Sequence, residues 1–242
     1  MPDLAIVTGG AHRMGRAFSE KLSNLGFDLL LHYFSSEAAA TRTQHELASE
    51  NVNVTLAQAD LTTSQGVVRL FKKVDELLKD KNTSLKVLVN SAAVMKRGNV
   101  RTLSLQDWKM AQNLNLQAPF LCSQQAYIRM KHGSLIVNVS DVGASKAWSK
   151  FPAYTVSKVA LESLTTVLAR SFAPRVRVNA IAPGLVLPSE DMPSAEWAML
   201  VSRIPLNRTA TLEEISSTLE FLLKNKYITG QTITVDGGYS LV

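Results

Sequence analysis

Two hydrophobic periodicities alternate along the whole chain, and this alternation limits the folds open to it. Short runs that favour β-strands appear at Leu4–Thr8, Asp28–Tyr33, Val52–Gln58, Leu85–Asn90, Ser134–Ser140, Val176–Ile181 and Thr232–Val235. The longer stretches between them place apolar residues on one face of a helix. Runs such as Val87–Val89 are apolar on both faces, which is typical of parallel strands covered by helices on each side. The sequence therefore predicts a doubly wound, Rossmann-type α/β fold with a seven-stranded parallel sheet.

We expect residues 1–242 to form one domain, because neither a linker nor an internal repeat divides the pattern. Residues 183–205 interrupt it with four prolines, a Ser-Glu-Asp cluster at 189–191 and a short apolar pattern around Trp197. Insertions of this length after a strand are often active-site lids. We therefore predict a substrate loop at 183–205, with a packed surface loop as the alternative.

Composition excludes several classes of protein. With 46% hydrophobic and 19% charged residues, the chain is not a disordered one. No apolar run approaches the roughly 20 residues that span a bilayer, and the first residues lack the features of a secretory signal. The single cysteine, Cys122, offers neither a disulfide nor a metal cluster. These features predict a cytoplasmic protein without a metal ion.

The net charge of +6 raises the question of an anionic partner. The densest basic stretch, Lys72–Lys86, is interrupted by Asp75, Glu76 and Asp80 at helical spacing and contains no interleaved aromatic residues. Such a stretch is typical of a solvated helix face. We expect a small-molecule substrate and neither a nucleic-acid nor a membrane partner.

A glycine-containing turn, Gly9 to Gly15, follows the first predicted strand and leads into a helix. At this place in a doubly wound sheet, helix N–H groups can face a bound pyrophosphate. Gly9 would permit the tight turn, and Gly15 would let the helix pack closely on the strand. A purely structural turn is the alternative, because a lone glycine turn is a weak signal.

The tip of the second strand indicates which dinucleotide would bind. An NAD site places an acid there, but the tip reads His-Tyr-Phe-Ser-Ser at 32–36, and we assign Glu37 to the first turn of the next helix. Hydroxyl groups beside a guanidinium favour a 2′-phosphate instead. The sequence therefore predicts NADP(H), held at this end by Gly9, Arg13, Met14, His32, Tyr33, Ser35 and Ser36.

Tyr154 and Lys158 are four residues apart in a strongly apolar helical pattern, so they share one helix face. An ammonium group beside a phenol is expected to lower the pKa of the phenol toward neutrality and make it a usable general acid. The pair alone is a very weak motif.

Together with this pair, further motifs make the chain resemble the short-chain dehydrogenase/reductase family from its first strand to its last residues. The matching motifs are Thr8-Gly9 with Gly15, Asp60-Leu61, Asn90-Ser91-Ala92-Ala93, Asn115 with Pro119, Tyr154 with Lys158, Arg177-Val178-Asn179 with Pro183-Gly184, and Asp236-Gly237-Gly238. The resemblance implies NAD(P)-dependent oxidoreduction at the carboxyl edge of the sheet. It also implies a homotetramer, for which the helical stretches Leu105–Met130 and Ala153–Phe172 are the expected contacts.

The resemblance also implies roles for single residues. Tyr154 would donate a proton, Lys158 would hold the nicotinamide ribose, and Asn115 would anchor a water relay to Lys158. Asp60 and Leu61 would contact adenine. The remaining residues expected around the cofactor are Asn90, Ser91, Ala92, Pro183 and Gly184.

Two departures from the common family pattern resemble the pteridine reductase branch. Arg13 stands where the glycine turn usually has Gly, and Asp141 stands where a substrate-binding Ser is usual, while Ser140 should point to the other side of its strand. The C-terminal third, including Leu185, is similar to that branch as well. A carboxylate repels a plain ketone but suits a ring with N–H groups. The alternative is that Asp141 points away or is a salt-bridged structural acid.

One position does not fit a pterin. The branch has an aromatic ring that stacks on the pterin, and here the corresponding residue is Met95, which gives apolar contact without a stacking face. Lys96 and Arg97 would either attract an acidic substrate tail or be solvated loop charges.

We therefore predict an NADPH-dependent oxidoreductase that delivers hydride to a C=N or C=O group, with a dihydropterin or folate as the first substrate class. The substrate would contact Met95, Asp141, Tyr154 and Leu185. The alternatives are a carbonyl reductase of the oxoacyl or sugar type and a non-catalytic NADP(H)-binding regulator.

Overall fold

The predicted strands form one parallel sheet in the computed structural model, which describes residues 3–79, 83–189 and 192–242. Within these ranges the sheet has seven strands in the order β3-β2-β1-β4-β5-β6-β7. Their bounds are β1 Leu4–Thr8, β2 Asp28–Tyr33, β3 Val54–Gln58, β4 Leu85–Asn90, β5 Met130–Val139, β6 Val176–Pro183 and β7 Thr232–Val235. The order reverses between β1 and β4, and in such sheets ligands bind at the carboxyl ends of the strands beside this point.

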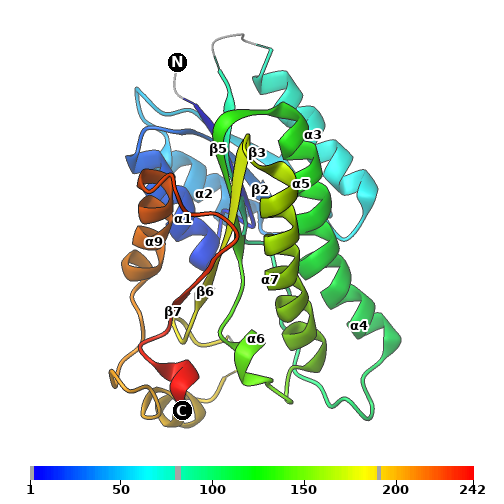
Figure 1. Ribbon diagram of the computed structural model, residues 1–242, viewed down its shortest axis with the longest axis vertical. Helices are drawn as coiled ribbons and strands as arrows, with labels where there is room; N and C mark the ends of the chain where they lie inside the picture. The colour runs from blue at the N-terminus through cyan, green and yellow to red at the C-terminus, as the bar shows by residue number, and fades with distance from the viewer. Residues whose placement is uncertain (1–2, 80–82, 190–191) are drawn as a thin grey trace.

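Helices cover both faces of the sheet (Figure 1). One face carries α1 (Arg13–Asn24), α2 (Glu37–Leu47) and α9 (Leu212–Lys224). The other carries α3 (Ser64–Leu77), α4 (Leu105–Gln112), α5 (Ala118–Arg129) and α7 (Pro152–Phe172). The doubly wound fold is therefore confirmed.

The two faces of the sheet bury separate cores because successive strand residues point in opposite directions. Leu30 packs with Phe71 and other residues on the α3, α5 and α7 side, whereas its neighbour Leu31 packs with Phe18 and Leu219 on the α1 and α9 side. These side chains are at most 1% exposed. Each contributes roughly 1.5–3 kcal/mol of burial free energy.

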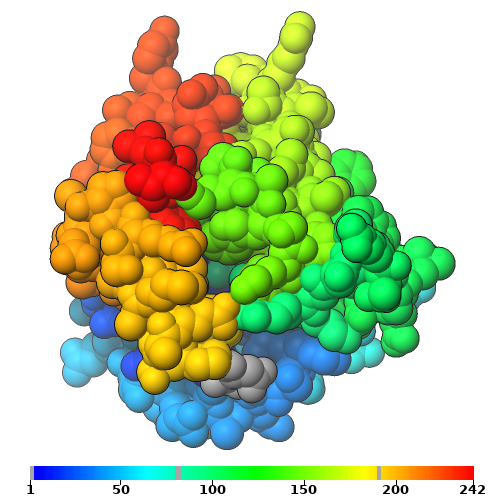
Figure 2. Space-filling view, turned by 90° about the horizontal axis from the view of Figure 1, so that it is seen from below, coloured from blue at the N-terminus to red at the C-terminus, as the bar shows by residue number. Residues whose placement is uncertain are grey.

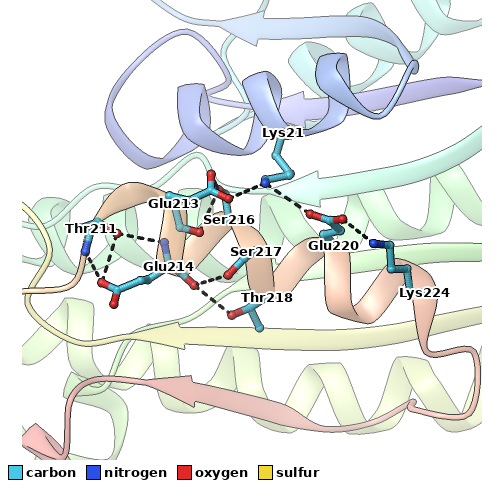
Figure 3. A network of polar contacts seen from close by, with 9 residues as sticks. All are labelled: Lys21, Thr211, Glu213, Glu214, Ser216, Ser217, Thr218, Glu220 and Lys224. Carbon is cyan, nitrogen blue, oxygen red and sulfur yellow. Dashed lines mark hydrogen bonds and ion pairs between the residues drawn. The ribbon is translucent and has the colours of Figure 1, made fainter.

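A polar network joins α9 to α1 (Figure 3). Lys21 of α1 donates to Glu213 at 2.6 Å and to Glu220 at 3.4 Å, both on α9. Thr211 and Glu214 form a capping box that begins α9, which satisfies N–H groups that have no partner inside the helix. The network fixes α9 against the helix that starts at the glycine turn.

The predicted helical stretch Leu105–Met130 is not one regular helix. A π-helical turn over Asn113–Gln117 separates α4 from α5. Pro119 lacks the N–H that would bond to the carbonyl of Asn115 four residues earlier, which favours such a change of hydrogen bonding.

Residues 183–189 and 192–205 lie at the carboxyl edge of the sheet, at the bottom of Figure 1, beside α6 (Gly143–Lys146) and the C-terminal turn. Their helix α8 (Ser194–Val201) joins a small apolar cluster there. The cluster contains Val142, Trp148, Leu185, Trp197, Leu200, Val201, Ile204 and Tyr239. Glu190 and Asp191 of the acidic cluster, and Asp80 of the basic stretch, lie outside the described residues.

No helix in the described part of the chain is both long enough and apolar enough to cross a membrane.

Candidate active site

A cleft of about 660 Å³ lies at the carboxyl edge of the sheet. Figure 2 views this edge, where the gold segment that carries α8 and the green segments border a hollow. The predicted site residues that line the cleft are Gly9, Arg13, Met14, His32, Asp60, Leu61, Ser91, Ala92, Met95, Asp141, Tyr154, Lys158, Pro183 and Gly184. Another hollow, of about 850 Å³, lies at the end of α9 around Phe221 and Tyr227, and its described lining contains none of the predicted site residues.

Tyr154, Lys158 and Asp141 meet at one end of this cleft. The Tyr154 hydroxyl donates to Oδ2 of Asp141 at 2.8 Å, and the other oxygen of Asp141 accepts from the Gly143 amide at 2.6 Å. The Lys158 ammonium donates to the Val139 carbonyl at 2.6 Å and lies 5.5 Å from the centre of the Tyr154 ring. Asp141 therefore faces the phenol and does not point away from it.

Burial and the charges of neighbouring groups shift the pKa values of Asp141, Tyr154 and Lys158. Burial raises the pKa of Asp141, although the Gly143 amide, Tyr154 and Lys158 oppose this. Burial, together with the neighbouring carboxylate of Asp141, raises the pKa of Tyr154 well above its usual range. Burial lowers the pKa of Lys158 to about 8, although Asp141 and Glu162 oppose this. Contrary to the prediction, the pKa of the phenol is therefore not lowered toward neutrality in this geometry, because burial and Asp141 raise it.

Asn115 lies in the π-helical turn and is 1% exposed. Its side-chain oxygen accepts from the Val94 amide at 2.8 Å, and its side-chain nitrogen donates to the Val94 carbonyl at 2.9 Å and to the Ser157 hydroxyl at 3.0 Å. Both N–H groups of the side chain are thus in use. The Asn115 side chain joins the loop after β4 to α7, so a water relay to Lys158 would have to use its main chain.

The other end of the cleft is the glycine turn between β1 and α1. Gly9 has a φ of +63°, which favours glycine, and a Cβ on Gly15 would lie 2.0 Å from the Gly9 carbonyl oxygen. The Thr8 hydroxyl accepts from the amides of Ser91 and Ala92 at 3.0 and 3.1 Å, which ties the turn to the end of β4. This role of Thr8 was not predicted, although Thr8 belongs to the first matching motif.

His32 does not offer a charge to a phosphate. Its Nδ1 accepts from the Gly9 amide at 3.1 Å and its Nε2 lies 2.9 Å from the Ala59 carbonyl oxygen, so both ring nitrogens are in use. Burial lowers the pKa of His32 to about 4, so the ring is neutral near pH 7. The ring thus holds the glycine turn to β2 and to the chain after β3, and the expectation that His32, which lines the cleft, contacts the cofactor stays a prediction.

Arg13 extends from the glycine turn across the cleft and donates to the carbonyls of Leu187 and Pro188 at 3.2 and 2.8 Å. Tyr33 is 9% exposed and packs with Ala11 and Ala40, so it faces the interior and does not line the cleft. Ser35 and Ser36 are exposed beyond the described lining. At this tip the described lining consists of His32 and Phe34, and Phe34 was not predicted.

Asn90 and Leu185 also point away from the cleft. The Asn90 side chain is 3% exposed and donates to Asn138 at 2.9 Å and to Ser123 at 3.3 Å inside the core. Leu185 belongs to the apolar cluster around α8. Because side chains alternate along an extended chain, the cleft receives Gly184 and Val186 instead. Further lining residues that were not predicted are His12, Thr62, Val94, Met110, Leu114, Val139, Ser140 and Leu187.

Arg97 and Lys96 after β4 both form ion pairs. Arg97 donates to both oxygens of Glu196 in α8 at 3.0 and 3.2 Å, and Lys150 lies 3.6 Å from the same carboxylate. Lys96 pairs with Asp107 at 2.7 Å. The Arg97 pair joins the loop after β4 to α8.

Comparison with known proteins gives consistent results over the whole chain. A family model described as enoyl-(acyl carrier protein) reductase matches residues 9–240. The 3-oxoacyl-[acyl-carrier-protein] reductase FabG of Staphylococcus aureus is 31% identical over 98% of this chain and 98% of that protein.

Two solved structures are similar over nearly the full length. FolM alternative dihydrofolate reductase 1 from Brucella suis in complex with NADP has a TM-score of 0.90 and 32% identity, covering 99% of this chain and 96% of that chain. The angucycline C-6 ketoreductase LanV with bound NADP has a TM-score of 0.93 and 27% identity, covering 99% and 96%.

Proposed function

This chain belongs to the short-chain dehydrogenase/reductase family, and we propose that it reduces a dihydropterin or dihydrofolate ring with NADPH. It is an oxidoreductase and its cofactor is NADP(H), as in the neighbours with bound NADP. The family and the cofactor follow from these comparisons, whereas the proposed substrate class rests on this chain's own residues.

The hydrogen bond from Tyr154 to Asp141, 2.8 Å long, carries the proposal. A ketone needs hydrogen-bond donors around its oxygen, whereas an ionised Asp141 can only accept. A pterin or folate ring offers N–H and amine groups to a carboxylate and C=N bonds to a hydride. The similarity to FolM alternative dihydrofolate reductase 1 supports the same substrate class.

The cleft suits a dinucleotide. At its glycine turn, a Cβ at Gly9 would lie 3.0 Å from Ala92, and a Cβ at Gly15 would clash with the Gly9 carbonyl. Both positions therefore require glycine, and no side chain covers the backbone there. The N-terminus of α1 favours a pyrophosphate. The residues that would hold the cofactor are Gly9, Arg13, Met14, Asp60, Leu61, Ser91, Ala92, Lys158, Pro183 and Gly184.

The chain's own residues would provide the proton. NADPH supplies a hydride when bound. Tyr154, which lines the cleft, keeps its proton over the whole neutral range because its pKa is raised, and its hydroxyl donates to Asp141. Asp141 accepts from the phenol and would orient the ring of the substrate. Lys158, with a pKa of about 8, places an ammonium beside the phenol at neutral pH.

A carbonyl reductase of the oxoacyl type is the second candidate. It is favoured by FabG of Staphylococcus aureus and by the ketoreductase LanV, which are similar over nearly the whole chain. Such a reaction would require Asp141 in its protonated form, and the raised pKa of Asp141 favours this form.

We also propose that residues 183–205 form the substrate loop, because Arg13, which lines the cleft, donates to Pro188 and Arg97 of the loop after β4 donates to Glu196. A homotetramer is proposed from apolar side chains that α4, α5 and α7 expose. They are Leu105, Met110, Phe120, Ile128, Val156, Val159 and Val167. Light scattering after size exclusion would measure a mass close to four times 26.5 kDa if this is right.

A panel of NADPH-oxidation assays tests the substrate class. The panel contains 7,8-dihydrobiopterin, 7,8-dihydrofolate, an acetoacetyl thioester and a simple ketoester, each with NADPH and with NADH. We expect kcat/KM for a dihydropterin or dihydrofolate to exceed that for both keto substrates by at least about tenfold. Faster turnover of the thioester would replace the first candidate by the second.

A further inference from the structure

Val139, the last residue of β5, and the two residues after it are hydrogen-bonded to three residues of α7. The Val139 carbonyl accepts from Lys158 at 2.6 Å, and Asp141 accepts from Tyr154 at 2.8 Å. Between them, Ser140 donates to Oε1 of Glu162 at 2.7 Å.

The three α7 residues, Tyr154, Lys158 and Glu162, are spaced four apart and therefore lie along one stripe of the helix. Two of the three bonds belong to the proposed active site. The third has no part in the proton transfer proposed above.

The hydrogen bond between Ser140 and Glu162 can affect the position of the chain after β5. The bond is partly buried: Ser140 is 2% exposed and lines the cleft, and Glu162 is half-buried. Loss of the acceptor would leave the Ser140 hydroxyl without its partner in α7. Its acceptor is a carboxylate, which makes the bond stronger than one between neutral groups. Ser140 also lies between Val139, the last residue of β5, which contacts Lys158, and Asp141, which contacts Tyr154. Any slip of Ser140 along α7 would therefore move both contacts.

We infer that Glu162 is a positioning residue, which acts through Ser140 to keep the end of β5 in register with Tyr154 and Lys158. The inference rests on the proposed site but not on the identity of the substrate. It assigns the Glu162 carboxylate the role of a hydrogen-bond acceptor for Ser140.

Three variants test this inference: Ser140→Ala, Glu162→Ala and Glu162→Gln. Hydrogen exchange is measured by mass spectrometry on the cofactor-free protein, in peptides that contain the Ser140 and Val142 amides. These amides bond to the carbonyls of Ile181 and Pro183 at 2.8 and 3.0 Å. NADPH affinity and kcat are measured in parallel, with the fastest substrate of the panel.

In both alanine variants we expect exchange at the end of β5 to rise roughly tenfold, about what the loss of one hydrogen bond gives. We expect kcat to fall by about the same factor, with NADPH affinity unchanged. Glutamine keeps an acceptor oxygen for Ser140 and should stay within about threefold of the parent in both measurements. The Ser140→Ala/Glu162→Ala double variant should lose no more than either single variant.

Several results would overturn the inference. Normal exchange and kcat in Glu162→Ala would show that the bond does not position the strand end. A glutamine variant as impaired as the alanine variant would mean that charge, rather than the hydrogen bond, matters. Faster exchange across all of α7 would indicate general loss of stability, for which Ser163→Ala, an exposed neighbour on the same helix, is the matched control. A wrong substrate class leaves the exchange results intact, so the two failures can be distinguished.

Discussion

The two ends of the cleft are built in different ways. At the chemical end, Asp141, Tyr154 and Lys158 come from one strand end and one helix and are bonded directly to that strand or to each other. At the phosphate end, the lining comes from the turns after β1, β2, β3 and β4 and from the segment after β6. Several polar side chains there are occupied in holding these turns together.

This difference explains which residues could be assigned in advance. A helix repeats every 3.6 residues, so Tyr154 and Lys158 must share a face, and the adjacent strand end brings in Asp141. In a turn, a polar side chain can face the ligand or bond to the backbone. His32 does the second, with both ring nitrogens bonded to protein.

Tyr154→Phe is the most severe test of the chemical end. Removing the hydroxyl removes the proposed proton donor, so kcat should fall by about a thousandfold or more. NADPH affinity, measured by the fluorescence of the bound cofactor, should change less than about threefold, because the ring remains. The matched control is Tyr227→Phe at a fully exposed tyrosine, which should leave kcat unchanged. Normal turnover in Tyr154→Phe would refute the assignment.

Asp141→Ser tests whether the acid at the chemical end sets the substrate class. A hydroxyl can donate to a carbonyl, whereas it binds ring N–H groups more weakly than a carboxylate does. We expect kcat/KM for the dihydropterin to fall roughly a hundredfold and that for the acetoacetyl thioester to rise. Unchanged dihydropterin reduction would show that Asp141 does not contact this substrate.

Much of the fold could be predicted from the sequence because a parallel sheet buried on both faces requires apolar runs. The β1, β2, β4 and β7 bounds agree with prediction. β5 begins at Met130 rather than at the predicted Ser134. The polar residues Lys131 and His132 interrupt the apolar pattern there, so no strand was predicted over these residues. The π-helical turn at Asn113–Gln117 was also missed, since it leaves the helical periodicity almost unchanged.

Within the site, motif positions were predicted better than side-chain directions. Asn90 and Leu185 follow strands at the right edge, yet both turn inward, to the core and to the α8 cluster. Glu162 was not identified, although its spacing of four residues after Lys158 was a usable signal. Spacing places a residue on a face, but the partner across the interface decides its role.

His32→Gln tests the structural role of the phosphate end through pH. The folded pKa of His32 is about 4, below the ordinary value of 6.5, so the unfolded chain binds a proton first as the pH falls. The stability from a neutral His32 is therefore complete above about pH 6.5 and is lost between there and pH 4. Between pH 8 and pH 5, the parent should lose about 2 kcal/mol of unfolding free energy that the glutamine variant keeps.

Urea unfolding at the two pH values measures this difference. His45→Gln, at an exposed histidine of α2, is the matched control and should lose as much stability as the parent. Equal pH dependence in the parent and in His32→Gln would mean that the ring becomes charged in the folded protein. In that case a role in phosphate binding would have to be considered again.

Arg13→Gln has the smallest expected effect and separates two roles of the phosphate end. If the guanidinium binds the 2′-phosphate, the Kd for NADPH rises about tenfold while that for NADH stays nearly unchanged. If it only donates to the Leu187 and Pro188 carbonyls, the Kd values for NADPH and NADH rise by the same factor, and protease cleaves the 183–205 segment faster. Arg16→Gln, which removes an exposed partner of Glu46, is the matched control. Because Arg13 is the cation among the described residues of the glycine turn itself, a selective loss of NADPH binding would show that this end depends on one charged side chain, whereas the chemical end combines Asp141, Tyr154 and Lys158.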